Sequence, residues 1–326
     1  MSNKTGWKEH LLKSGIPLEF EIKKYLATKG CISNFEYTYL RNNESDLPTE
    51  FSYDIDSSYI KGHHFVDLMI ECKYRHESTK WVFLPEEYGG PDEIEFTSFM
   101  HKNSHFSTAR QVRYEHPIAF APLCSKGIEL TSDGPNPKTI TQAINQLSYA
   151  MAERIVNGMH HQLDVVLGEQ FGGTNFYNIP IIITTAELYR IKEESDIATI
   201  KGAQNIEDIS DKAPFLIIKN KPGIDLETYN NQIFQVFIDE YGKEKLEKHL
   251  FSFNKDVDFV MSVIAKEYCP SAIAVIHYSK EENGLEQFFT YIDRVFNPDE
   301  EIIALIKQKS DELKAMLQKF QTHKKA

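Results

Sequence analysis

The stretch FVDLMIECKYR, residues 65–75, is the clearest strand in the sequence, and the fold is best worked out from it. Side chains alternate along a strand, so every second residue forms one apolar face that would pack into a core: Val66, Leu68, Ile70 and Cys72. The opposite face carries the remaining side chains: Asp67, Met69, Glu71, Lys73 and Arg75. Glu71 and Lys73 therefore point the same way, about 6–7 Å apart along the strand.

A carboxylate beside an ammonium group suits metal-assisted hydrolysis of a phosphodiester. Glu71 would hold a hard cation, and the backbone carbonyl of Cys72 could add a second oxygen ligand. Lys73 would orient the attacking water or stabilise the developing charge. The competing interpretation is a solvated ion pair, which is common on surface strands.

A second predicted strand, EFSYDIDSSYI at 50–60, adds two aspartates. Strict alternation places Asp54 and Asp56 on one face, and aspartate is disfavoured within strands, so the pair needs a reason. Asp56 precedes Glu71 by fifteen residues, enough for a turn and an antiparallel return that brings both carboxylates to one metal. Alternatively, the two aspartates close a turn with Ser57 and Ser58.

At this point the sequence resembles a known superfamily. A helix with GIPLEFE at 15–21, a strand with YDID at 53–56 and a strand with IECKYR at 70–75 follow one another as in the PD-(D/E)xK, or restriction-endonuclease-like, nucleases. The proline that usually precedes the aspartate is absent, since Tyr53 and Ile55 stand there instead.

The resemblance implies roles for particular residues. Asp56 and Glu71 would bind Mg²⁺ or Mn²⁺, and Lys73 would act on the water. The helical acid would be Glu19, with Glu21 as the alternative. A later helix of such nucleases often brings a glutamine and a tyrosine to the site, for which Gln146 with Tyr149 is the match and Gln142 the alternative. The products would carry 5′-phosphate and 3′-hydroxyl ends.

The expected fold is α/β, a restriction-endonuclease-like core with a mixed central sheet flanked by helices and an irregular insertion at about 86–140. Periodicity predicts further strands: 35–41, 81–84, 179–184, 215–219 and 273–278. It also predicts helices: 7–29 with a break near Gly15 and Pro17, a short one near 106–114, 139–157, 228–250, 254–266, 284–295 and 299–321. The nuclease-like core would span 1–221. Residues 222–326 would continue the same domain or form a small helical subdomain.

Composition bounds the function. Apolar residues make up 41% and charged residues 26%, as in ordinary globular proteins. No apolar run reaches the ~20 residues needed to cross a bilayer, which argues against a membrane protein. Four scattered cysteines without a CxxC pair and an N-terminus without a signal-like segment predict a cytoplasmic location. The net charge of −12 works against nucleic-acid binding, which usually draws on basic surfaces.

Two functions from different classes follow. The first is a Mg²⁺-dependent nuclease acting on DNA in restriction, repair or defence, with RNA left open as a substrate and a homodimer or defence-system proteins as further partners. The second is a catalytically inactive protein that keeps the nuclease fold as a nucleic-acid-binding or assembly module. The acidic charge favours the second function, and the intact set of Asp56, Glu71 and Lys73 favours the first.

Overall fold

In the computed structural model, most of the chain is described at the level of side chains. The described residues are 6–42, 47–86, 99–106, 121–168, 173–252 and 254–301, together with 303, 304, 307, 308 and 311. The helix expected near 106–114 and most of the one expected at 299–321 fall outside these ranges.

One mixed sheet runs through the described part of the chain. Its order is β1-β2-β3-β8-β12-β11-β6-β4-β9-β10, with β5 pairing to β8 and β7 to β6. The strands are β1 (Ile32–Asn42), β2 (Pro48–Lys61), β3 (His64–Lys73), β4 (Lys80–Pro85), β5 (His101–Lys102), β6 (Leu123–Thr131), β7 (Gly134–Asn136), β8 (Asn175–Thr184), β9 (Glu187–Ile191), β10 (Ser210–Ala213), β11 (Phe215–Lys219) and β12 (Ala272–His277). β1, β2 and β3 are antiparallel, whereas β3, β8 and β12 are mutually parallel.

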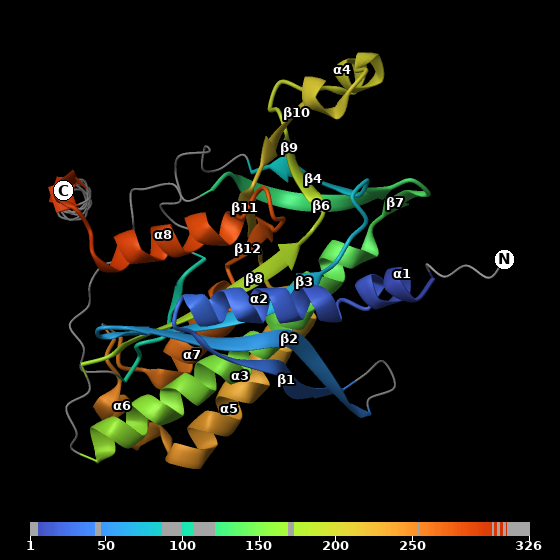
Figure 1. Cartoon of the computed structure of the whole chain (residues 1–326). Coiled ribbons are helices and arrows are strands. Elements are labelled where there is room, and N and C mark those ends of the chain that lie inside the picture. The colour runs from blue at the N-terminus through green and yellow to red at the C-terminus, as the bar shows by residue number, and fades with distance from the viewer. Residues whose placement is uncertain are drawn as a thin grey trace.

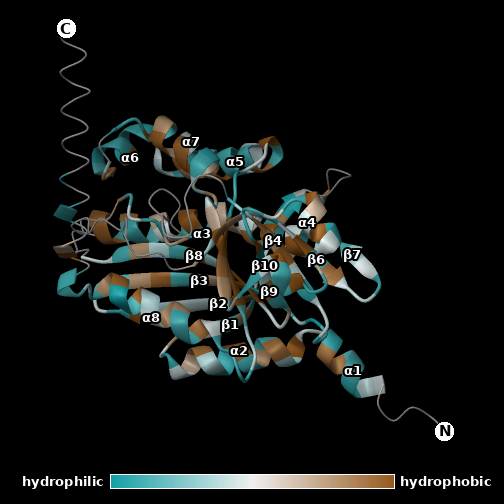
Figure 2. Ribbon diagram, turned by 90° about the horizontal axis from the view of Figure 1, so that it is seen from above, coloured by the Kyte–Doolittle hydropathy of each residue, from teal (hydrophilic) through white to brown (hydrophobic). Residues whose placement is uncertain are grey.

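Helices cover both faces of this sheet, so the molecule has three layers (Figures 1 and 2). The helices are α1 (Gly6–Lys13), α2 (Ile16–Thr28), α3 (Lys138–Leu167), α4 (Ile197–Gly202), α5 (Ile224–Tyr241), α6 (Lys243–His249), α7 (Val257–Glu267) and α8 (Gly284–Phe296). α2 and α8 share one buried cluster with the sheet, and α3, α5, α6 and α7 share the cluster on the other face.

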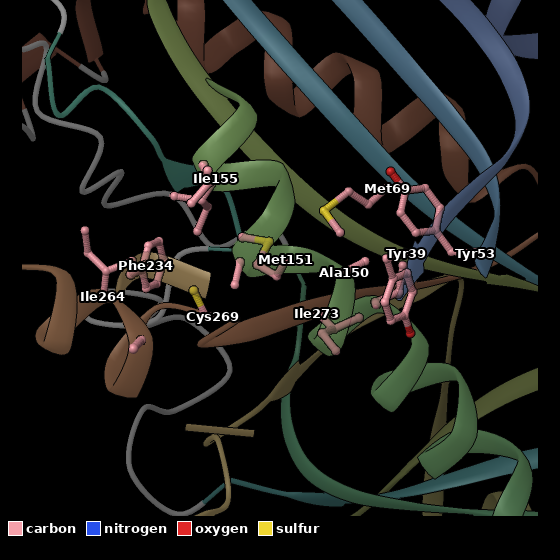
Figure 3. Close-up of a cluster of buried hydrophobic side chains, with 14 of the residues drawn as sticks. Tyr39, Tyr53, Met69, Ala150, Met151, Ile155, Phe234, Ile264, Cys269 and Ile273 are labelled. Carbon is pink, nitrogen blue, oxygen red and sulfur yellow. The ribbon is translucent and has the colours of Figure 1, made fainter. Parts of the chain in front are cut away.

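The core between the sheet and α3 is built where apolar positions of β1, β2 and β3 meet one side of the helix. Figure 3 shows Tyr39, Tyr53 and Met69 gathered near Ala150 and Met151 of α3, and all five side chains are almost fully buried. Complete burial of such side chains contributes roughly 1.5–3 kcal/mol each. This packing fixes the position of α3 against the strand that carries Glu71.

The sequence predicted most of these elements. The apolar, β-branched runs at 179–184, 215–219 and 273–278 lie within β8, β11 and β12, and the mixed central sheet flanked by helices is confirmed. The helix expected at 228–250 is two helices, because the chain turns at Gly242 with φ of 84°, a conformation that suits glycine.

The prediction of an irregular insertion at 86–140 is wrong for the second half of that range. Residues 123–131 form β6, which pairs with β4 on one side and with β11 on the other. Its sequence, LCSKGIELT, lacks both a long apolar run and clean alternation, so partners distant in the chain decide its conformation. The C-terminal part contributes β12 between β8 and β11, inside the same sheet.

Within the described ranges, no helix is both long and apolar enough to cross a membrane.

Candidate functional site

Glu71 is the most deeply buried acid of the predicted site. β3 lies between β2 and β8, and the Glu71 side chain on its α3-facing side is fully shielded from solvent. Its Oε1 accepts a hydrogen bond from the ammonium group of Lys73, while its Oε2 is buried without a hydrogen-bond partner. A buried carboxylate oxygen without a partner is costly unless it serves a further purpose.

Gln146 of α3 lies beside Lys73, as the sequence predicted. Its Oε1 is 3.4 Å from Lys73 Nζ, and its Nε2 donates to the backbone oxygen of Ser52 at 3.0 Å. Tyr39 Oη in turn donates to the backbone oxygen of Gln146 at 3.0 Å. Gln142, the alternative to Gln146, is exposed. Tyr149, the tyrosine expected beside Gln146 at the site, instead packs against Arg41, whose guanidinium carbon lies 4.0 Å from its ring centroid.

The structure brings Asp54, rather than Asp56, next to Glu71. The antiparallel register pairs Asp56 with Met69 and Ile55 with Ile70, and its continuation places Asp54 opposite Glu71. The ladder stops there, and Asp54 Oδ2 instead accepts a hydrogen bond from the backbone N–H of Cys72 at 2.6 Å. The expectation that Asp56 stands beside Glu71 is thus corrected by the register.

The alternation of β2 breaks at this position. Tyr53 is buried in the α3-side cluster and Ile55 in the α2-side cluster, although two residues apart on a regular strand should share a face. On β1 the residue at the same level is Glu36, which has a φ of 57°, unusual for a residue with a side chain. Such outliers concentrate at functional sites. No pattern in the sequence predicts the break in the alternation of β2 or the position of Glu36 beside it.

Asp56 belongs to a separate polar network further along α3. Its Oδ1 accepts from Tyr53 Oη at 2.6 Å and lies 3.3 Å from Arg154 Nη2. The same guanidinium nitrogen is 2.9 Å from Asp67 Oδ1. Gln146 and Arg154 lie eight residues apart on α3, which is about 12 Å. Glu71 and Asp67 lie four residues apart on β3, which is about 13 Å. The two networks therefore lie at matching positions of α3 and β3, separated by a similar distance along both elements.

Glu19 completes the site from the opposite layer. Its carboxylate lies near enough to Asp54 and Lys73 for their charges to change its pKa, whereas Glu21 is exposed. α2 begins after Gly15, whose φ of 84° suits glycine, and a Cβ there would lie only 3.1 Å from Glu19 Oε1. The glycine of GIPLE therefore both starts the helix and leaves room for the acid.

The electrostatics of the cluster reflect too many acids around one lysine. Burial, followed by the charge of Asp54, raises the pKa of Glu71 to about 8, against the opposing effect of Lys73. Burial and the charges of Asp54 and Glu36 raise the pKa of Glu19 to about 7. Burial also raises the pKa of Asp54, against its bond from Cys72. Perturbed carboxyl groups of this kind favour a bound cation or proton chemistry.

The donor set fits a hard divalent cation. Carboxylate oxygens are the ligands that Mg²⁺ prefers, and it commonly needs only one or two of them beside its waters. In the part of the chain that the structure describes, no three His, Cys, Asp or Glu side chains are assembled as a ready metal site. Asp54 and the unpartnered Oε2 of Glu71 are the atoms that would receive a cation, and Cys72, whose thiol is buried on the other face, could offer only its carbonyl.

No protein-family model, no curated protein and no solved structure matches this chain.

Proposed function

We propose that the chain is a Mg²⁺-dependent nuclease of the PD-(D/E)xK type that hydrolyses phosphodiester bonds of DNA, with Asp54 in the position that the resemblance assigned to Asp56. The observation that supports it best is the meeting of Glu71, Asp54 and Lys73, with one Glu71 oxygen buried and unpartnered. The unpartnered Glu71 oxygen leaves a free acceptor beside this ion pair, which a bound cation would satisfy.

Each side chain has a distinct part in this proposal. Asp54 and Glu71 would hold Mg²⁺ or Mn²⁺, which when bound would supply Lewis acidity to the phosphate. Lys73 would stabilise the negative charge that develops on the phosphate oxygens, with Gln146 fixing the position of its ammonium group. Glu19, with a pKa near neutrality, could take up the proton of the attacking water at its carboxylate.

The test is cleavage of plasmid and single-stranded DNA with Mg²⁺ or Mn²⁺ by the wild type, Glu71→Gln and Lys73→Ala. Cleavage should be lost in both variants, whereas Glu187→Gln, which removes a partly exposed acid paired with Lys80, should cut as the wild type does. Equal cutting by all four proteins would defeat the proposal. RNA belongs in the same assay, because the site chemistry does not distinguish the two.

Calorimetric titration with Mn²⁺ separates the nuclease from an inactive module with the same fold. Binding that disappears in Glu71→Gln supports the nuclease. No binding that depends on Glu71 would favour the module, for which the net charge of −12 is the physical argument.

A further inference from the structure

Three large aromatic rings are exposed on α1, α2 and β1, and the last two of these elements carry acids of the candidate site. Trp7 of α1, Phe20 of α2 and Phe35 of β1 are 63%, 51% and 45% exposed. Rings of this size usually bury most of their surface, because it is largely apolar. Their common exposure beside a candidate site needs an explanation.

Each ring carries a lysine ammonium over its face. Lys8 Nζ lies 5.8 Å from the Trp7 centroid, Lys24 Nζ 4.1 Å from that of Phe20, and Lys23 Nζ 4.0 Å from that of Phe35. No carboxylate pairs with these three lysines among the residues that the structure describes. A flat ring next to a positive charge is the combination that binds a base and its phosphate.

Two of the rings belong to residues that are next in sequence to acids of the site. Phe20 directly follows Glu19 on α2, and Phe35 directly precedes Glu36 on β1. Trp7 lies on α1, which contacts α2. The aromatic surface, defined by Trp7, Phe20 and Phe35, thus comes from α2 and β1, which carry Glu19 and Glu36, and from α1, which contacts α2.

Charge along this segment differs from that of the whole protein. Residues 6–29 contain five lysines and three glutamates, whereas the whole chain carries a net charge of −12. A local basic excess is what an acidic protein needs in order to hold a polyanion.

We propose that single-stranded DNA binds across this aromatic surface, with bases stacked on Trp7, Phe20 and Phe35 and phosphates near Lys8, Lys23 and Lys24. The inference rests on the proposed function and names its substrate class. Stacking on these rings requires base faces that a duplex keeps covered, so the surface selects an unpaired strand and directs it to the site.

The protein carries its own reporter for this binding. Of its two tryptophans, Trp81 is fully buried and Trp7 is exposed, so a ligand at the surface should quench mainly Trp7. The protein is titrated in EDTA, first with oligothymidylate and then with a duplex of equal length. Oligothymidylate should quench the fluorescence with an affinity that falls as salt rises, and the duplex should bind more weakly.

Variants locate the site of binding. Phe20→Ala and Phe35→Ala should each weaken oligothymidylate binding by about fivefold or more, since one stacked base contributes that much. Phe259→Ala, at a phenylalanine of α7 that is 53% exposed, is the matched control and should bind as the wild type does. Circular dichroism of each variant confirms that it is folded.

Three outcomes would overturn the inference: unchanged binding in Phe20→Ala and Phe35→Ala, equal binding of the duplex, or a response to anionic phospholipid vesicles but not to oligothymidylate. The last would mean that α1 and α2, which also expose Leu11, Leu12 and Ile16, dock on a membrane surface. Because the titration contains no divalent ion, it measures binding without cleavage. If oligothymidylate binds to the aromatic surface but no cleavage depends on Glu71, only the proposed function is contradicted. If cleavage depends on Glu71 but the aromatic residues do not affect binding, only this inference is contradicted.

Discussion

The backbone N–H of Cys72 donates a hydrogen bond to Asp54 Oδ2 at 2.6 Å, across a point where β2 and β3 have stopped pairing. This bond holds the Asp54 carboxylate at the level of Glu71, one residue away in β3. Burial raises the pKa of Asp54, whereas the bond and the charge of Lys73 both lower it. The bond is therefore central to how the two acids come together.

The two aspartates of YDID should behave in opposite ways. Asp54→Asn should lower metal-dependent cleavage by roughly two orders of magnitude or more, as the loss of one preorganised electrostatic contact does. Asp56→Asn should keep the cleavage rate and lose stability, because Asp56 pairs with Arg154 and Tyr53. Single-turnover cleavage and urea unfolding of both variants measure this. Loss of cleavage in Asp56→Asn alone would restore Asp56 to the site.

Arg154 should be a major contributor to stability. It is the shared partner of Asp56 and Asp67, and its side chain is only 13% exposed. Removing one member of a buried ion pair leaves the other charge uncompensated, so Arg154→Met should cost about 3–5 kcal/mol in urea unfolding. Adding Asp67→Asn should recover part of the loss. Arg294→Ala, in an exposed pair with Asp299, should change stability by no more than about 0.5 kcal/mol.

Gly15 should be needed for activity as well as for folding. Gly15→Ala puts a side chain at φ of 84°, which costs about 1–2 kcal/mol, and crowds Glu19 Oε1. Gly30→Ala is the matched control, since Gly30 has φ of 79° and open space around it. Both variants should lose similar stability, but only Gly15→Ala should also cut DNA more slowly. Equal cleavage by the two would mean that Glu19 does not depend on the space at Gly15.

Buried His101 should make the protein less stable in acid. Burial lowers its pKa to about 4, and the neutral ring accepts a hydrogen bond from the backbone N–H of Ser271 at 2.9 Å. Between pH 6.5 and about 4 the unfolded histidine binds a proton that the folded one does not, so stability falls as pH is lowered, by up to about 1.4 kcal/mol per pH unit.

The variant His101→Gln should reduce the change of unfolding free energy with pH over the same interval by up to about 1.4 kcal/mol per pH unit, the effect of one bound proton. Urea unfolding at several pH values between 4 and 7 measures the effect. A slope equal to that of the wild type would contradict the prediction.

Much of this fold could be predicted because it follows from local pattern. Strand β3 alternates cleanly, and the structure places Val66, Leu68, Ile70 and Cys72 in the α2-side cluster, as that pattern requires. The helix with Glu19 and the helix with Gln146 were likewise legible from their spacing. β6 was not, because its sequence is only strand-like in contact with β4 and β11.

The sequence alone is enough to place Glu71 and Lys73 on the same face of β3, because side chains two residues apart on a strand point the same way. It could not choose between Asp54 and Asp56, which alternation treats alike. Only the tertiary structure decided that choice, through the register that pairs Asp56 with Met69 and through the break in β2 at Asp54. The tertiary structure also added Glu36, because residues from three strands and two helices meet only after long-range pairing has set their relative positions.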